Sequence, residues 1–127
     1  MALPQRHRLR GQRLFDALYQ RGQASHGPLM SLRWLAADNN LLPPHQRQEA
    51  VSPWRCGVVI SSKVHKRAVR RNRLRRQLHE GLQRVSWRPG LPPLWLLISL
   101  KPGSADLDRH HLLGECQRLL SKAGLLP

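Results

Sequence analysis

Acidic residues are scarce in this chain. Its 127 residues include 7 Asp and Glu against 22 Lys and Arg, so the formal net charge is +15 at pH 7. Self-repulsion on this scale destabilises a compact chain unless a polyanion neutralises it. The imbalance indicates nucleic acid as the first candidate partner and an anionic membrane surface as the second.

Cysteine and long apolar runs are also scarce. Cys56 and Cys116, 60 positions apart, are the only cysteines, which argues against a disulfide framework or a zinc ribbon. Each is most simply a small buried hydrophobe. The longest mainly apolar run covers the seven residues 94–100, far too short to span a bilayer. The N-terminus has charge but no apolar core behind it, as a signal peptide would require. We therefore predict a cytoplasmic, reduced protein without a membrane partner.

The few acids do not suggest a catalytic cluster, because they are scattered over predicted helices and loops: Asp16, Asp38, Glu49, Glu80, Asp106, Asp108 and Glu115. A two-metal nuclease would need grouped carboxylates, so we predict no metal bound by the protein. The seven histidines leave open a His-dependent ribonuclease that uses general acid–base pairs. We nevertheless predict no catalytic residue in this chain.

The most unusual stretch runs from Lys63 to Val85 and reads as a helix. Leu74, Leu78, Leu82 and Val85 form an apolar stripe on its C-terminal half. On the N-terminal half of the helix, the positions in line with this stripe are occupied by arginines. Seven of the eleven residues 66–76 are basic, and six of them are Arg. Arg suits bidentate contact with phosphate. The alternative is a solvated helix face, although such a face normally mixes charges and Glu80 is the only acid here.

A second candidate element is a short helix at residues 12–20. Leu14 and Leu18 can face a core, while Phe15 and Tyr19, the only Phe and the only Tyr, lie on an adjacent strip four residues apart. From spacing alone, both could be core aromatics or an exposed stacking surface.

The remaining pattern predicts a single α+β domain over residues 1–127, with helices packed on a mixed four-stranded sheet. The expected order is α-β-β-β-α-β-α. Residues 1–10 form a basic arm and residues 38–53, with three prolines, a long inter-strand loop. Strands are predicted at residues 24–26, 30–37, 54–62 and 94–101. A last helix over residues 106–122 is predicted to start at Ser104 or Asp106.

The segment SKVHKRAVRRNRLRRQLHE resembles the signature of the bacterial ribonuclease P protein subunit. The run from Arg71 to Arg76, RNRLRR, matches the helical part of that signature at every position. With the preceding strand, the order of elements and the two aromatics, the resemblance covers nearly the whole chain. It implies a ribosomal-protein-like fold whose βαβ crossover is left-handed, although such crossovers are right-handed in about 98% of cases.

The resemblance also implies the partners, which are the catalytic RNA of ribonuclease P and precursor tRNA, and not DNA. In the family, the RNA cleaves the 5′ leader from precursor tRNA with Mg²⁺ bound by that RNA, and the protein assists this endonuclease reaction. Phe15 and Tyr19 are carried over as the leader-binding aromatics. The RNA-binding residues carried over are Lys63, Lys66, Arg67, Arg70, Arg71, Asn72, Arg73, Arg75 and Arg76.

The match departs from the family where a pair of lysines is expected before the helix, because Lys63 stands between Ser62 and Val64.

Three other functions compete with the resemblance. A ribosomal or assembly protein would share the basic profile but need no aromatic cleft. A self-sufficient ribonuclease would cleave RNA alone, and a DNA-binding protein would place the Arg-rich helix in a major groove.

Overall fold

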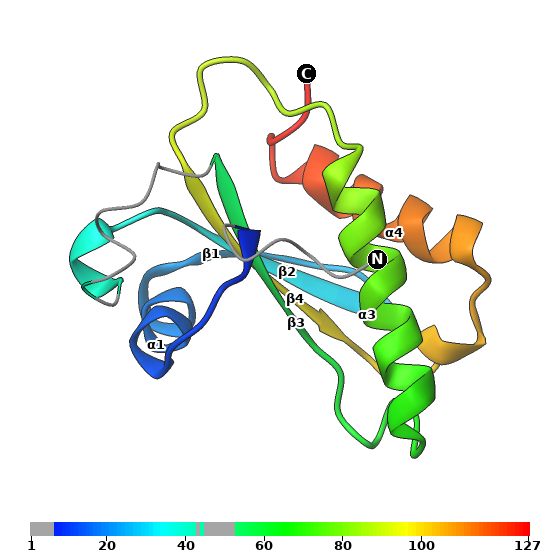
Figure 1. Cartoon of the computed structure of the whole chain (residues 1–127). Helices are drawn as coiled ribbons and strands as arrows, with labels where there is room; N and C mark the ends of the chain where they lie inside the picture. The colour runs from blue at the N-terminus through cyan, green and yellow to red at the C-terminus, as the bar shows by residue number, and fades with distance from the viewer. Residues whose placement is uncertain (1–6, 43, 45–52) are drawn as a thin grey trace.

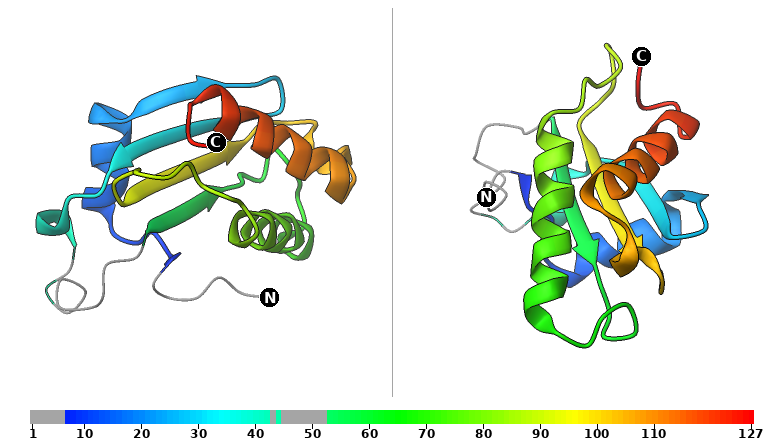
Figure 2. Two further views of the ribbon diagram at one scale, coloured as in Figure 1. Left: turned by 90° about the horizontal axis from the view of Figure 1, so that it is seen from above. Right: turned by 90° about the vertical axis from the view of Figure 1, so that its right-hand side faces the viewer.

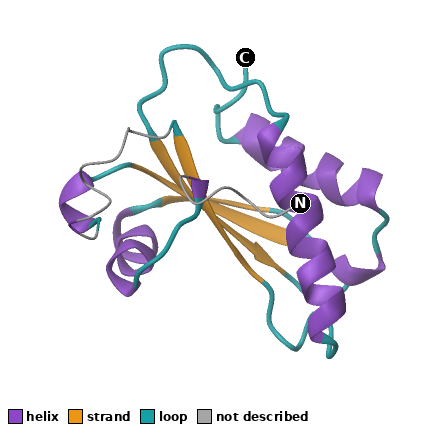
Figure 3. Ribbon diagram, viewed as in Figure 1, coloured by secondary structure: helices purple, strands orange, loops and turns teal. Residues whose placement is uncertain are grey.

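The computed structural model describes residues 7–42, 44 and 53–127. In the described part, three α-helices surround a four-stranded sheet (Figures 1 and 3). The described part also contains the 3-10 helices η2 (Asn39–Leu41) and η3 (Ser104–Asp106). The main elements in chain order are α1 (Gln12–Arg21), β1 (Gln23–His26), β2 (Met30–Ala36), β3 (Trp54–Val59), α3 (Ala68–Gln83), β4 (Leu94–Leu100) and α4 (Arg109–Lys122).

The sheet has the order β1-β2-β4-β3 and mixes both pairing types. β4 runs antiparallel to β2 and parallel to β3. Strand β4 is therefore central, and six of its seven residues are buried, as its continuous apolar sequence predicts. The α+β fold with a mixed four-stranded sheet is confirmed, and α3 forms the β3-to-β4 crossover. The hand of this crossover stays a prediction that rests on the resemblance.

Helices cover both faces of the sheet, with α1 on one face and α3 and α4 on the other (Figures 1 and 2). The α3 face holds the larger core, in which Leu74, Leu78 and Leu82 are almost fully buried. The predicted apolar stripe is thus confirmed. Cys56 and Cys116 are free and buried in the same core. Burial raises the pKa of both thiols, that of Cys116 to about 12.

The crossover helix begins later than predicted, at Ala68 and not at Lys63. The preceding strand also ends earlier, at Val59, because the chain turns at Ser61, whose carbonyl accepts a hydrogen bond from the Val64 N–H (3.0 Å). That turn buries Val64 in the core. Lys63 and two other predicted RNA-binding residues, Lys66 and Arg67, therefore precede the helix.

Part of two predicted segments falls outside the described residues. These are residues 1–6 of the basic arm and residues 43 and 45–52 of the predicted loop 38–53. The described beginning of that loop contains η2, which the sequence analysis did not predict. No helix in the part of the chain that the structure describes is long and apolar enough to cross a membrane.

The prediction that Ser104 or Asp106 starts the last helix is wrong. Both residues lie in η3, and the Ser104 hydroxyl donates to the Lys101 carbonyl at 2.7 Å. Helix α4 begins instead at Arg109, and Asp108 is its N-cap, since its carboxylate accepts a hydrogen bond from the His111 backbone N–H at 2.8 Å. This bond lowers the pKa of Asp108.

We expect Asp108→Ala to lower the free energy of unfolding by about 0.5–2 kcal/mol, because the substitution leaves a helix N–H without its capping acceptor. Urea denaturation followed by circular dichroism measures this loss. Asp108→Asn, which keeps a capping oxygen, is the matched control and should retain most of the stability. Equal destabilisation by both substitutions would contradict a capping role.

Candidate nucleic-acid interface

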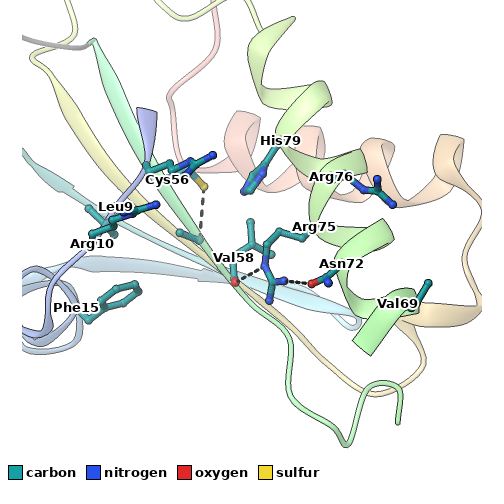
Figure 4. A pocket seen from close by; sticks show the side chains of 12 residues that line it. Leu9, Arg10, Phe15, Cys56, Val58, Val69, Asn72, Arg75, Arg76 and His79 are labelled. Carbon is teal, nitrogen blue, oxygen red and sulfur yellow. Dashed lines mark hydrogen bonds between the residues drawn. The ribbon is translucent and has the colours of Figure 1, made fainter. Parts of the chain in front are cut away.

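A cavity of about 630 Å³ lies along the outer edge of β3. Figure 4 shows Phe15 on one side of this strand and side chains of α3 on the other. Its position follows from the topology, since β3 is the last strand of the sheet and α1 and α3 pack on opposite faces. The cavity is lined by Arg8, Leu9, Arg10, Phe15, Cys56, Gly57, Val58, Val69, Asn72, Arg75, Arg76 and His79.

Helix α3 supplies one wall through residues 72, 75, 76 and 79, whose spacing of 3, 1 and 3 places them on one helical face. Arg75 is fixed at both ends of its guanidinium. Its Nε donates to the Val58 carbonyl (3.4 Å), and its Nη1 donates to Asn72 Oδ1 (2.8 Å). This wall therefore presents an oriented cation beside the edge of the sheet. Such a group matches phosphate geometry better than a mobile one.

His79 shares this wall, although the sequence analysis did not assign it a role. Burial, together with the nearby guanidinium groups of Arg75 and Arg8, lowers the pKa of His79 to about 4. The imidazole is therefore neutral at physiological pH. Its place at i+3 from Arg76 and i+4 from Arg75 was the available signal in the sequence.

The opposite wall contains Phe15, which lies against Gly57 of β3. A Cβ atom built on Gly57 would lie 3.2 Å from both Cε1 and Cζ of the Phe15 ring. Only glycine leaves the ring this close to the strand without displacing it. Phe15 is half-buried, so part of the ring is supported by the protein and part remains open for stacking.

The N-terminal segment closes one end of the cavity. Arg8 pairs with Cys56 in a parallel bridge, and the Leu9 N–H donates to the Cys56 carbonyl at 3.1 Å. Leu9 is buried beside Leu14 and Leu18 in a second, smaller core, which lies between α1 and the sheet. Arg10, which follows, is exposed and lines the cavity. The predicted basic arm thus contributes to the site, although none of its residues was predicted as a site residue.

Tyr19 does not line the cavity. It lies one helical turn beyond Phe15, is 51% exposed, and has the Arg33 guanidinium 5.0 Å from its ring centroid. Arg33 pairs with Leu97 across the sheet, and Leu97 pairs with Gly57. Directly paired residues share one face of a sheet, so the Tyr19–Arg33 pair lies on the face that carries Phe15. The two predicted aromatics occupy neighbouring positions and not one pocket.

The other predicted RNA-binding residues point in several directions. Arg70 donates to the Ala105 carbonyl at 2.7 Å, on the η3 side of the helix. Arg71 folds back to donate to the carbonyls of His65 and Lys66, both at 2.8 Å. The remaining four are exposed near the start of α3 and stand outside the lining of the cavity: Lys63, Lys66, Arg67 and Arg73.

The cavity therefore combines cations, one aromatic face and a neutral imidazole. Among residues 7–42, 44 and 53–127, no three His, Cys, Asp or Glu side chains are grouped so that they could hold a metal ion. The arrangement can bind an anionic chain that carries flat groups, as a single-stranded nucleic acid does.

The chain is similar to known proteins of one family. The family model described as Ribonuclease P matches residues 3–124. A "Ribonuclease P protein component" of a Synechococcus species is 53% identical over 127 residues, which is 98% of each chain. One of Prochlorococcus marinus is 49% identical over 127 residues, which is 99% of each chain.

Solved structures of more distant relatives have the same fold. An RNase P protein mutant of Staphylococcus aureus, described as having defective mRNA degradation activity, superposes with a TM-score of 0.76 at 14% identity, over 94% of this chain and 90% of that one. The RNase P protein of Thermotoga maritima, in a complex with 1-(4-fluorophenyl)-2-thiourea, superposes with a TM-score of 0.68 at 17% identity, over 91% of this chain and 98% of that one. On the family match and the close relatives, the chain belongs to the ribonuclease P protein component family, which forms part of the tRNA-processing ribonuclease P.

Proposed function

We propose that this protein binds the catalytic RNA of ribonuclease P and the single-stranded 5′ leader of precursor tRNA, and so assists removal of the leader. The catalytic RNA performs the cleavage with Mg²⁺ that it binds itself, in the cytoplasm. The protein contributes contacts that position the substrate. Because a positioned substrate has already lost part of its translational and rotational freedom, the entropy cost of reaching the transition state is smaller.

The observation that supports leader binding most directly is the cavity of about 630 Å³, which places Phe15 opposite the cationic face of α3. A leader is unpaired, so its bases are free to stack on an aromatic face while its phosphates meet guanidinium groups. In this arrangement Phe15 stacks one base, and Arg75, Arg76 and Arg10 neutralise neighbouring phosphates.

The Tyr19–Arg33 pair extends the same surface. Its exposed ring offers a second stacking position, and the guanidinium beside it supplies a cation for the adjoining phosphate. The exposed residues near the start of α3 then remain for folded RNA, whose phosphates need cations but no aromatic face. We assign Lys63, Lys66, Arg67 and Arg73 to the catalytic RNA. Arg70, Arg71 and Asn72 remain proposed RNA contacts: backbone carbonyls hold the side chains of Arg70 and Arg71, and Asn72 lines the cavity.

The test is single-turnover cleavage of precursor tRNA by the matching catalytic RNA at low Mg²⁺, with and without the protein. Two substrates are compared, one with a leader of several nucleotides and one with a single leader nucleotide. We expect the protein to tighten binding of the long-leader substrate and to accelerate its cleavage, and to change the short-leader reaction much less, because only the long leader reaches the cavity.

Other outcomes separate the competing functions. No effect on either substrate would contradict the proposal and favour a ribosome-associated role. Cleavage by the protein without the catalytic RNA would identify a self-sufficient ribonuclease. Displacement of precursor tRNA by equimolar duplex DNA would indicate a DNA-binding protein.

A further inference from the structure

His79 lines the cavity and takes no part in the proposed phosphate and stacking contacts. It projects from α3 toward β3, between Cys56 and Arg75 (Figure 4). Neither of its ring nitrogens has a hydrogen-bond partner among the residues that the structure describes. A neutral imidazole carries one donor and one acceptor, and both are unused here.

These two nitrogens remain open to the cavity. In the described part of the chain, Ser25 Oγ is the only fully buried side-chain nitrogen or oxygen without a partner. The unpartnered nitrogens of His79 are therefore not sealed in the core, and the ring lines a hollow large enough for a nucleotide. A polar group in this position gains a hydrogen bond when a ligand enters.

The charge of the ring decides which part of a nucleotide it suits. With a pKa of about 4, roughly one His79 side chain in a thousand is protonated at pH 7. The groups that face it from the neighbouring elements are Arg75 of α3, Arg8 of the N-terminal segment and the neutral Cys56 thiol of β3. Phosphates are therefore drawn to the guanidinium groups, and the imidazole is left for neutral edges.

Base edges are such neutral groups, and in single-stranded RNA they are exposed for hydrogen bonding. Contacts to phosphates position a strand, whereas contacts to base edges distinguish one nucleotide from another. We propose that His79 hydrogen-bonds to the base edge of an unpaired leader nucleotide and so gives this protein a base preference at one leader position. This inference rests on the proposed leader binding and adds a specificity-determining residue to it.

The test uses the full-length protein with the matching catalytic RNA and a set of long-leader precursor tRNAs in which each leader position carries A, C, G or U. Dissociation constants are measured for the wild type, His79→Leu and His79→Arg, with His110→Leu on exposed α4 as the matched control. Each protein is also measured over a series of salt concentrations, and thermal melting verifies that each variant is folded.

We expect the wild type to prefer one base at one position by about 5- to 100-fold, as a good base contact does. His79→Leu should abolish this preference without changing the salt dependence, and His110→Leu should change neither. His79→Arg should also lose the preference, but should steepen the slope of log K against log salt by about 0.7, the value for one added contact to single-stranded phosphate. His79→Gln, which keeps a neutral donor and acceptor, provides a second variant if His79→Leu fails to fold, and should alter which base is preferred.

Two results of these measurements would overturn the inference: a wild type with no base preference, or a His79→Leu protein with an unchanged preference. A weaker salt dependence in His79→Leu would identify a phosphate contact and would also overturn it. In each case, if long leaders still bind more tightly than single-nucleotide leaders, the proposed function stands while the role of His79 fails.

Discussion

Phe15→Ala is expected to weaken binding of a long-leader precursor tRNA to the holoenzyme by about 5- to 150-fold, since removing one base–aromatic stack costs about 1–3 kcal/mol. Binding of a substrate with a single leader nucleotide should be unchanged, because it does not reach the cavity. The ratio of the two dissociation constants, measured at fixed salt with the catalytic RNA present, is the quantity that reports stacking.

The size of the expected effect follows from how the ring is supported. Phe15 packs against Gly57 at the edge of β3 and against the second core. A ring fixed in this way loses little side-chain entropy when a base stacks on it. Tyr19, in contrast, is 51% exposed and contacts the Arg33 guanidinium. We therefore expect Tyr19→Ala to have a smaller effect than Phe15→Ala on the same substrate.

A loss of stability must be separated from a loss of stacking, because Phe15 also contributes to the second core. Phe15→Leu serves this purpose, since it retains apolar packing but removes the aromatic face. If Phe15→Leu binds long leaders as tightly as the wild type, stacking on Phe15 is wrong. If it behaves as Phe15→Ala does, while its melting temperature stays close to that of the wild type, stacking is supported.

The fold was predictable from the sequence wherever one residue pattern sufficed. One local signal is the stripe of Leu74, Leu78 and Leu82, whose spacing matches the period of a helix. The other is the continuous apolar run 94–100, which is typical of a buried strand. Both elements are confirmed. The start of α3 was not predictable in this way. It depends on Val64, whose burial in the core turns the chain before the helix begins.

The candidate site was predictable only in part, because the sequence shows which residues are basic but not where each side chain points in the fold. Arg70 and Arg75 look equivalent in the sequence, yet Arg70 bonds to the Ala105 carbonyl and Arg75 to the Val58 carbonyl. Those acceptors belong to distant segments that only the tertiary fold brings close. The same holds for Arg10, which reaches the cavity because Arg8 pairs with Cys56 along the edge of β3.

A second large effect is expected when cations are removed from two sides of the cavity. The double substitution Arg10→Gln and Arg76→Gln removes one guanidinium from the N-terminal segment and one from the α3 wall. Both residues are exposed, and neither has a hydrogen-bond or ion-pair partner in the part of the chain that the structure describes, so the fold loses no bond. Hydrogen bonds to charged groups contribute about 1.5–3 kcal/mol each. We therefore expect at least about 100-fold weaker binding of long-leader precursor tRNA.

The matched control removes the same charge elsewhere. Arg84 and Lys122 line a second hollow, between α3 and α4, and Arg84→Gln with Lys122→Gln also lowers the net charge from +15 to +13. Loss of two single-stranded phosphate contacts should reduce the slope of log K against log salt by about 1.4. If leader binding depended only on the net charge, both double variants would lose the same affinity. A localised interface requires instead that the control remain close to the wild type, and equal losses in the two would exclude the cavity as the leader-binding site.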